Sequence, residues 1–219
     1  MKKFSFVDLV TLIIGLLPIG YLIYMYPTMP AIVPTHFGIN GKPDSFDPKS
    51  QLVIIECVLI GISFLVYLLM KFMSAIDPKR YAEFNQSRYN KLGVVIVIFC
   101  AIIAVVITCG ASQKSFNVGN VIFALAGLLF IFMGNLMYNI KPSYFVGIRT
   151  PWTLESPDNW RATHHLAGKL FVAGGIIITI AKLVLPMPLG IHIVFIGLGV
   201  MVLVPITYSY IYFKKHQVK

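Results

Sequence analysis

Long apolar runs alternate with short polar segments along the whole chain. A helix needs about 20 mostly apolar residues to cross the hydrocarbon core of a bilayer, which is about 30 Å thick. Lipid offers no partner to open backbone groups, and no alternating barrel pattern is present, so each sufficiently long run is expected to be a helix. The sequence therefore predicts an all-α polytopic membrane bundle with six transmembrane helices, over residues 9–26, 52–70, 92–109, 118–138, 170–185 and 193–213.

The composition supports this class. Of the 219 residues, 58% are hydrophobic and only 12% are charged, against roughly a quarter charged in an average soluble domain. A soluble domain of this size could not bury so much apolar surface, and a disordered chain would not carry it. The three cysteines, Cys57, Cys100 and Cys109, lie inside apolar runs, so they are expected to pack and not to form a disulfide framework.

The basic residues distinguish the two sides of the bundle. Fourteen Lys and Arg fall on one side and four on the other. The positive-inside rule then places both termini in the cytoplasm of a multi-pass plasma-membrane protein. We interpret the net charge of +10 as this signal together with contact to anionic lipid, and not as direct nucleic-acid binding.

The spans divide into two expected units. Residues 1–91 form a two-span unit with a Pro-rich outer loop and an amphipathic inner loop, and residues 92–219 form a four-span unit. The outer loop, residues 27–50, contains five prolines, which favour extended backbone, and Asn40-Gly41 is a turn signal.

The first inner loop has a helix-start signal. Asp77-Pro78 places a capping residue before a proline at the first helical position. Tyr81, Phe84 and Arg88 then recur at helical spacing. We expect this segment to lie in the plane of the lipid headgroups.

The second inner loop, residues 139–168, is the richest in polar and aromatic groups. Ser156-Pro157-Asp158 predicts a helix start, and the helix is expected to continue into the fifth span with Trp160 and His164 on one face. Its aromatic and basic residues suit either anchoring at the membrane interface or docking of a cytoplasmic partner. The candidate binding residues here are Arg149, Thr150, Trp152, Trp160, Arg161 and His164.

Polar residues elsewhere give two further candidate groups. In the outer loop, His36, Asp44 and Lys49 belong either to a rigid cap over the bundle or to an extracellular recognition surface. Within the spans, Glu56 and Asn135 are candidate intramembrane polar groups. Glu56 is expected to make a structural contact, to be protonated or to pair with Lys182, while an ion path would need more polar residues at mid-membrane.

No pattern indicates a metal, a cofactor or an enzyme. Adjacent residues on a helix point about 100° apart, so His164 and His165 cannot easily share one ion. Nucleophile elbows, zinc-protease motifs and phosphate-binding loops are lacking in the sequence. Asp8 and Glu56 are expected near opposite membrane faces, which prevents a catalytic carboxylate pair.

Two segments resemble the SdpI family of bacterial multispanning immunity proteins. The first comprises Met29–Phe37, Gly41–Asp44 and Lys49 in the outer loop. The second is Gly147–Thr153, with its Arg-Thr-Pro-Trp-Thr run, followed by Trp160-Arg161, His164 and Gly168–Phe171. Ser143 departs from the Asn usual in the family.

The resemblance implies a bacterial plasma-membrane protein that protects against a secreted peptide toxin and captures a cytoplasmic transcriptional repressor. On this hypothesis the outer loop binds the extracellular peptide toxin, and the inner loop transmits the signal or docks the repressor. A small solute transporter or channel-like protein is the alternative, and it predicts a polar path through Glu56. A membrane enzyme acting on lipid or peptide is a third class, and it would require turnover that depends on His164.

Overall fold

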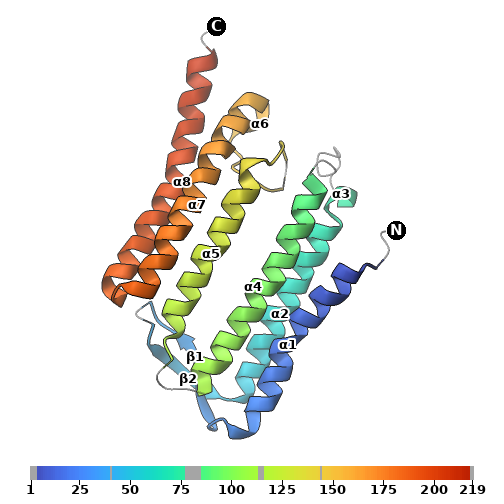
Figure 1. Ribbon diagram of the computed structural model, residues 1–219, viewed down its shortest axis with the longest axis vertical. Coiled ribbons are helices and arrows are strands. Elements are labelled where there is room, and N and C mark those ends of the chain that lie inside the picture. The colour runs from blue at the N-terminus through green and yellow to red at the C-terminus, as the bar shows by residue number, and fades with distance from the viewer. Residues whose placement is uncertain (1–3, 40, 77–84, 113–115, 144, 218–219) are drawn as a thin grey trace. The chain divides into compact units, whose positions relative to one another are not determined.

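The computed structural model describes residues 4–39, 41–76, 85–112, 116–143 and 145–217. Within them, six helices are long and apolar enough to cross a membrane, so the predicted all-α polytopic bundle is confirmed (Figure 1). These helices are α1 (Phe6–Met25), α2 (Ser50–Lys71), α4 (Gln86–Ser112), α5 (Val118–Tyr138), α7 (Pro157–Val184) and α8 (Met187–Gln217). The shorter elements are η1 (Tyr26–Thr28), β1 (Ile32–Phe37), β2 (Pro43–Pro48), α3 (Met73–Ile76) and α6 (Pro151–Glu155).

Several helices extend beyond the apolar runs that predicted them. The helix predicted from Ser156 begins as expected, since the Ser156 hydroxyl accepts a hydrogen bond from the backbone of Asn159. It continues without a break into the fifth span as α7. Most of the expected interfacial segment, including Asp77-Pro78, Tyr81 and Phe84, lies outside the described residues, whereas Arg88 belongs to α4.

The chain separates into two compact units. One comprises residues 1–71 and 90–122, and the other comprises residues 72–89 and 123–219. The first therefore contains α1, the β-hairpin, α2 and most of α4, while the second contains most of α5, the long inner loop, α7 and α8. A boundary at residue 91 between a two-span and a four-span unit stays a prediction.

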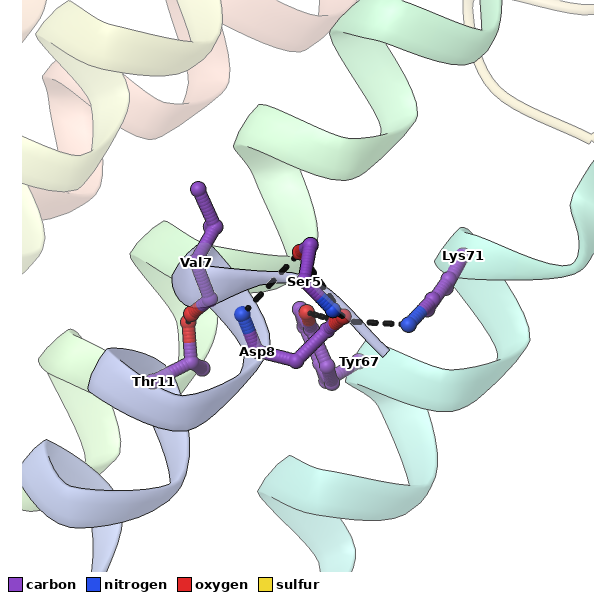
Figure 2. A network of polar contacts seen from close by, with 6 residues as sticks. All are labelled: Ser5, Val7, Asp8, Thr11, Tyr67 and Lys71. Carbon is purple, nitrogen blue, oxygen red and sulfur yellow. Dashed lines mark hydrogen bonds and ion pairs between the residues drawn. The ribbon is translucent and has the colours of Figure 1, made fainter. Parts of the chain in front are cut away.

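In the first unit, a buried carboxylate joins the start of α1 to the end of α2. Ser5 and Asp8 form a capping box, in which the Ser5 backbone nitrogen donates to Asp8 Oδ2 over 2.6 Å. Figure 2 shows Tyr67 and Lys71 of α2 reaching the same carboxylate, where both donate to Oδ1. Asp8 is 5% exposed, and these donors compensate for the loss of water around its charge.

Asp8 of α1 contacts the end of α2, far from Glu56, which lies near the start of α2. Asp8 contacts Tyr67 and Lys71, which follow Glu56 by 11 and 15 positions in the sequence. At about 1.5 Å per residue, this separation is roughly 16 to 22 Å along the helix axis. The two acids therefore do not form the carboxylate pair that acid–base catalysis would use.

In the second unit, α5 and α7 approach closely through glycines. A Cβ atom added at Gly134 would lie 2.7 Å from the carbonyl oxygen of Gly168, and one added at Gly175 would lie 2.5 Å from that of Gly127. Only small residues permit such close approach of two helix backbones, which is the usual packing mode inside a membrane. Along the other side of α7 runs α8 (Figure 1).

Candidate functional site

The Pro-rich outer loop folds into an antiparallel β-hairpin. Strand β1 pairs with β2, with Ile32 opposite Pro48 and Phe37 opposite Pro43. The predicted turn contains Gly41, whose φ of 73° is a backbone conformation that favours glycine. The sequence predicted extended backbone and a turn here, but the pairing of the two strands was not predicted.

Two contacts hold the hairpin against the helices of the first unit. Val33 is fully buried and packs in a cluster with Leu22, Leu52 and Ala111. The Lys49 ammonium donates to the carbonyl oxygen of Tyr26 over 2.9 Å and lies 4.4 Å from the centre of the Tyr26 ring. Lys49, a candidate for ligand binding, is therefore occupied in fastening the hairpin to the end of α1.

His36 and Asp44 form a contact across the hairpin. The Nδ1 atom of His36 lies 2.5 Å from Oδ1 of Asp44, and their side chains are 69% and 52% exposed. An ion pair so open to solvent contributes little to stability. These two candidate residues are thus brought together and remain accessible from outside the protein.

A groove lies between the hairpin and the end of α4, with Phe116 and Asn117 also in its walls. Its volume is about 480 Å³. Most of its walls are apolar, and two of the lining residues, Ile32 and Phe46, are 64% and 59% exposed. The remaining lining residues are Pro30, Pro34, Phe37, Gly41, Lys42, Pro43, Gly110, Ala111 and Ser112.

The candidate aromatic residues of the inner loop are buried and hydrogen-bonded. Trp160 donates its ring N–H to the carbonyl oxygen of Ile140 over 2.9 Å and stacks on His164, with ring centres 4.0 Å apart. His164 Nε2 accepts from the backbone N–H of Ile148, so its Nδ1 carries the proton and donates to the Trp160 carbonyl. Both side chains are 1% exposed, and they support the loop from inside.

Gly147 permits this packing. Its φ is 125°, and a Cβ atom there would lie 2.5 Å from His164 Nε2 and 2.8 Å from the Trp160 ring. Both the backbone angle and the space therefore require glycine at this position. The loop is built around the stacked pair of Trp160 and His164.

The Arg-Thr-Pro-Trp-Thr run caps the short helix α6. Thr150 is its N-cap and forms a capping box with Thr153, whose hydroxyl also donates to the carbonyl of Ile148. Trp152 donates to the Ser209 hydroxyl over 2.6 Å, which ties α6 to α8. Thr150 and Trp152 thus have structural partners within the second unit, as Trp160 and His164 do.

The start of the inner loop is held by two side chains, one just before α4 and one within it. The Asn85 amide donates to the carbonyl of Lys141 and accepts from its backbone N–H, at 3.0 and 3.1 Å. The Ser143 hydroxyl lies 2.5 Å from the Tyr89 hydroxyl and accepts from the backbone of Phe145. A serine hydroxyl therefore supports this turn where the SdpI family usually has an amide.

Arg149 and Arg161 differ from the other candidates in the inner loop, because both are exposed. Arg149 immediately precedes the cap of α6, and Arg161 lies on the first turns of α7. Guanidinium groups in this position can contact carboxylates of a partner or phosphates of lipid.

The candidate intramembrane groups occupy contrasting surroundings. Glu56 is fully buried, and its Oε1 accepts from the Thr108 hydroxyl of α4. Asn135 is exposed on α5. Lys182 is buried in the second unit, with its ammonium 5.1 Å from the centre of the Phe123 ring.

Sequence reasoning missed several residues that define these sites. Ile32 and Phe46 were not singled out, although both belong to the short alternating segments of the hairpin. Ser5 was not singled out either, although its spacing to Asp8 is that of a capping box at the start of the first apolar run. Thr108 carries no such signal, because its partner Glu56 lies on another helix.

These features define an all-α, multi-pass membrane protein, and comparisons with known proteins place it more closely. Residues 139–209 match the SdpI/YfhL protein family, and residues 13–61 match a domain of unknown function, DUF1648. Over 180 residues the chain is 26% identical to Immunity protein SdpI of Bacillus subtilis (strain 168), covering 82% of this chain and 81% of that protein. No solved structure matches the chain.

The family resemblance predicted from the sequence is confirmed by these matches. The SdpI/YfhL match runs from the inner loop through most of α8, and the DUF1648 match contains the hairpin and Glu56. Together with the six apolar helices, the similarity supports a multi-pass protein of the plasma membrane.

Proposed function

We propose that this protein is a membrane immunity protein that binds a secreted peptide toxin in the groove beside its β-hairpin. The groove carries the proposal, because it is an accessible and mostly apolar surface in a loop expected to face the cell exterior. The similarity to Immunity protein SdpI gives the class of protein. Protection of this kind needs binding and no catalysis.

The chemistry of the groove suits an apolar peptide segment. Exposed apolar side chains that line a concavity are typical of surfaces that bind a partner. Ile32 and Phe46 provide such side chains. His36 and Asp44, on the same hairpin, add polar groups that can bind the peptide backbone or its charged ends.

Phe46→Ser tests this assignment. The Phe46 side chain is 59% exposed and lines the groove, so its loss is expected to weaken toxin binding with little effect on folding. Ile39→Ser is the matched control, because Ile39 is 64% exposed on the same hairpin but is not a lining residue. The variants are expressed in a sensitive strain that is challenged with candidate peptide toxins.

Against a toxin from which the parent protein protects, Phe46→Ser is expected to raise sensitivity while Ile39→Ser protects normally. Equal membrane levels of the two variants establish that the difference is functional. Full protection by Phe46→Ser would contradict binding in the groove.

For the inner side, we propose that Arg149 and Arg161 form a docking surface for an acidic partner. The supporting observation is that these two guanidinium groups are exposed, whereas the side chains of Trp152, Trp160 and His164 hydrogen-bond to other parts of the second unit. A cytoplasmic repressor, as the family resemblance implies, is the proposed partner, and lipid phosphate offers the same groups a second contact.

A further inference from the structure

A second, smaller pocket lies between the end of α1 and the start of α2. Its volume is about 270 Å³, slightly under the roughly 300 Å³ at which small-molecule sites begin. This size suits one side chain. Its lining residues are apolar or weakly polar apart from one carboxyl group, and they are Ile19, Leu22, Ile23, Tyr26, Pro27, Val53, Glu56 and Cys57.

The pocket opens on the apolar surface of the first unit. Ile23, one of its walls, is 68% exposed, and Cys57 is also exposed. Glu56 lies six residues after the first residue of α2, which is about 9 Å along the helix. A ligand would therefore enter from the bilayer, within the apolar layer.

Glu56 lines the pocket, and one of its two carboxyl oxygen atoms has no hydrogen-bond partner among the described residues. Its Oε1 is bound by Thr108, whereas its Oε2 is buried and has no hydrogen-bond partner among the described residues. A buried carboxylate is strongly destabilising unless a cation or further donors compensate for it. Acidic groups at this depth are typically functional.

We propose that this pocket binds a basic side chain, a primary ammonium on an alkyl stem, from a membrane-inserted apolar peptide. The alkyl stem would contact Leu22, Ile23 and Val53, and the ammonium would donate to Oε2 of Glu56. This inference deepens the proposed function and rests on it for the source of the peptide.

A peptide fits better than an aminolipid. The ammonium of a phospholipid headgroup is attached to a phosphate, which would bring a negative charge towards Glu56 inside the apolar layer. A lysine side chain carries its charge alone at the end of an apolar stem, and it can extend away from the helix that bears it.

Cys57 gives a direct measurement, because it lines the pocket and is exposed. The full-length protein, carrying Cys100→Ala and Cys109→Ser, is placed in phosphatidylglycerol nanodiscs and labelled with a membrane-permeant maleimide. The probe is a Leu/Ala-rich transmembrane peptide with one lysine about six residues from its end. The same peptide with norleucine in place of lysine is the control ligand.

The lysine peptide is expected to slow labelling of Cys57 about tenfold when its free concentration is about ten times its Kd. The norleucine peptide should have little effect. Glu56→Gln, which keeps the shape of the side chain, should abolish the difference between the two peptides. Equal protection by both peptides, or an unchanged difference in Glu56→Gln, would overturn the proposal.

A second pair of variants keeps the test valid if Glu56→Gln does not fold. Ile23→Trp narrows the pocket at its exposed wall, and Leu17→Trp adds the same group at a position that is 61% exposed on α1 and outside the pocket. Only Ile23→Trp should remove protection by the lysine peptide. Loss in both variants, or in neither, would contradict binding in this pocket.

The lipid alternative is tested with phosphatidylethanolamine nanodiscs. If Cys57 is already protected there without peptide, and Glu56→Gln removes that protection, the site binds a lipid ammonium and the peptide proposal is wrong. The assay uses no toxin, so its failure is distinguishable from loss of toxin protection in Phe46→Ser.

Discussion

In the hairpin, the side chains of His36 and Asp44 are more than half exposed, whereas the rings of Trp160 and His164, on the first turns of α7, are almost completely buried. Both regions contain residues that suggested binding sites. In the inner loop, however, most of these side chains have structural partners. A cluster of polar and aromatic residues can therefore serve to stabilise a loop and not to bind a ligand. Solvent exposure distinguishes the side chains that are candidates for binding from those that stabilise the loop.

The comparison can be tested first in the inner loop, where the largest effect is expected. Trp160→Ala removes a buried ring, its stacking on His164 and its hydrogen bond to Ile140. We expect a loss of about 3 to 5 kcal/mol in the free energy of unfolding. Unfolding in a detergent series that includes a denaturing detergent provides the measurement.

Arg161→Ala is the matched control, because Arg161 is the next residue but is exposed. Its unfolding free energy should stay within about 0.5 kcal/mol of the parent protein. Similar losses in the two variants would contradict the distinction between supporting and exposed side chains.

A smaller effect is expected within the hairpin. Lys49→Met keeps most of the alkyl stem but removes the hydrogen bond to Tyr26 and the contact with its ring. The expected cost is about 1 to 2 kcal/mol, since Lys49 is only half-buried. Thermal unfolding of purified protein measures it.

His36→Ala serves as the comparison on the same hairpin. Its exposed contact with Asp44 should contribute less than about 1 kcal/mol. If His36→Ala destabilises the protein more than Lys49→Met does, the roles assigned to these two residues would be reversed.

The smallest effect on stability is expected for Arg149→Ala. Arg149 is exposed, so membrane insertion and thermal unfolding should be unchanged. Protection against the toxin should be lost, because we propose that protection also requires docking at the inner surface. Normal toxin resistance at equal protein level would reject this site.

The sequence predicted the parts of the fold that depend on local pattern. Six apolar runs predicted six spans, and Ser156-Pro157-Asp158 predicted the start of α7. The common face of Trp160 and His164 also followed from helical spacing, and both are buried. These features need only the length of an apolar run, a capping residue or the helical repeat.

The missing parts depend on contacts between distant segments. Glu56 and Thr108 are 52 positions apart, and no spacing rule connects them. The side chain of Lys49 could point to solvent or to α1, and only the folded hairpin directs it to Tyr26. The loop's polar residues suggested ligand binding equally well until their partners were known.

The proposed roles of the hairpin and the inner loop require that these two regions face opposite sides of the membrane. Ile39→Cys on the hairpin and Glu155→Cys at the end of α6 place single thiols at exposed positions, in protein whose native cysteines are replaced. A membrane-impermeant maleimide should label Ile39→Cys in intact cells and Glu155→Cys only after the cells are opened. Labelling of both residues from the same side would contradict the account.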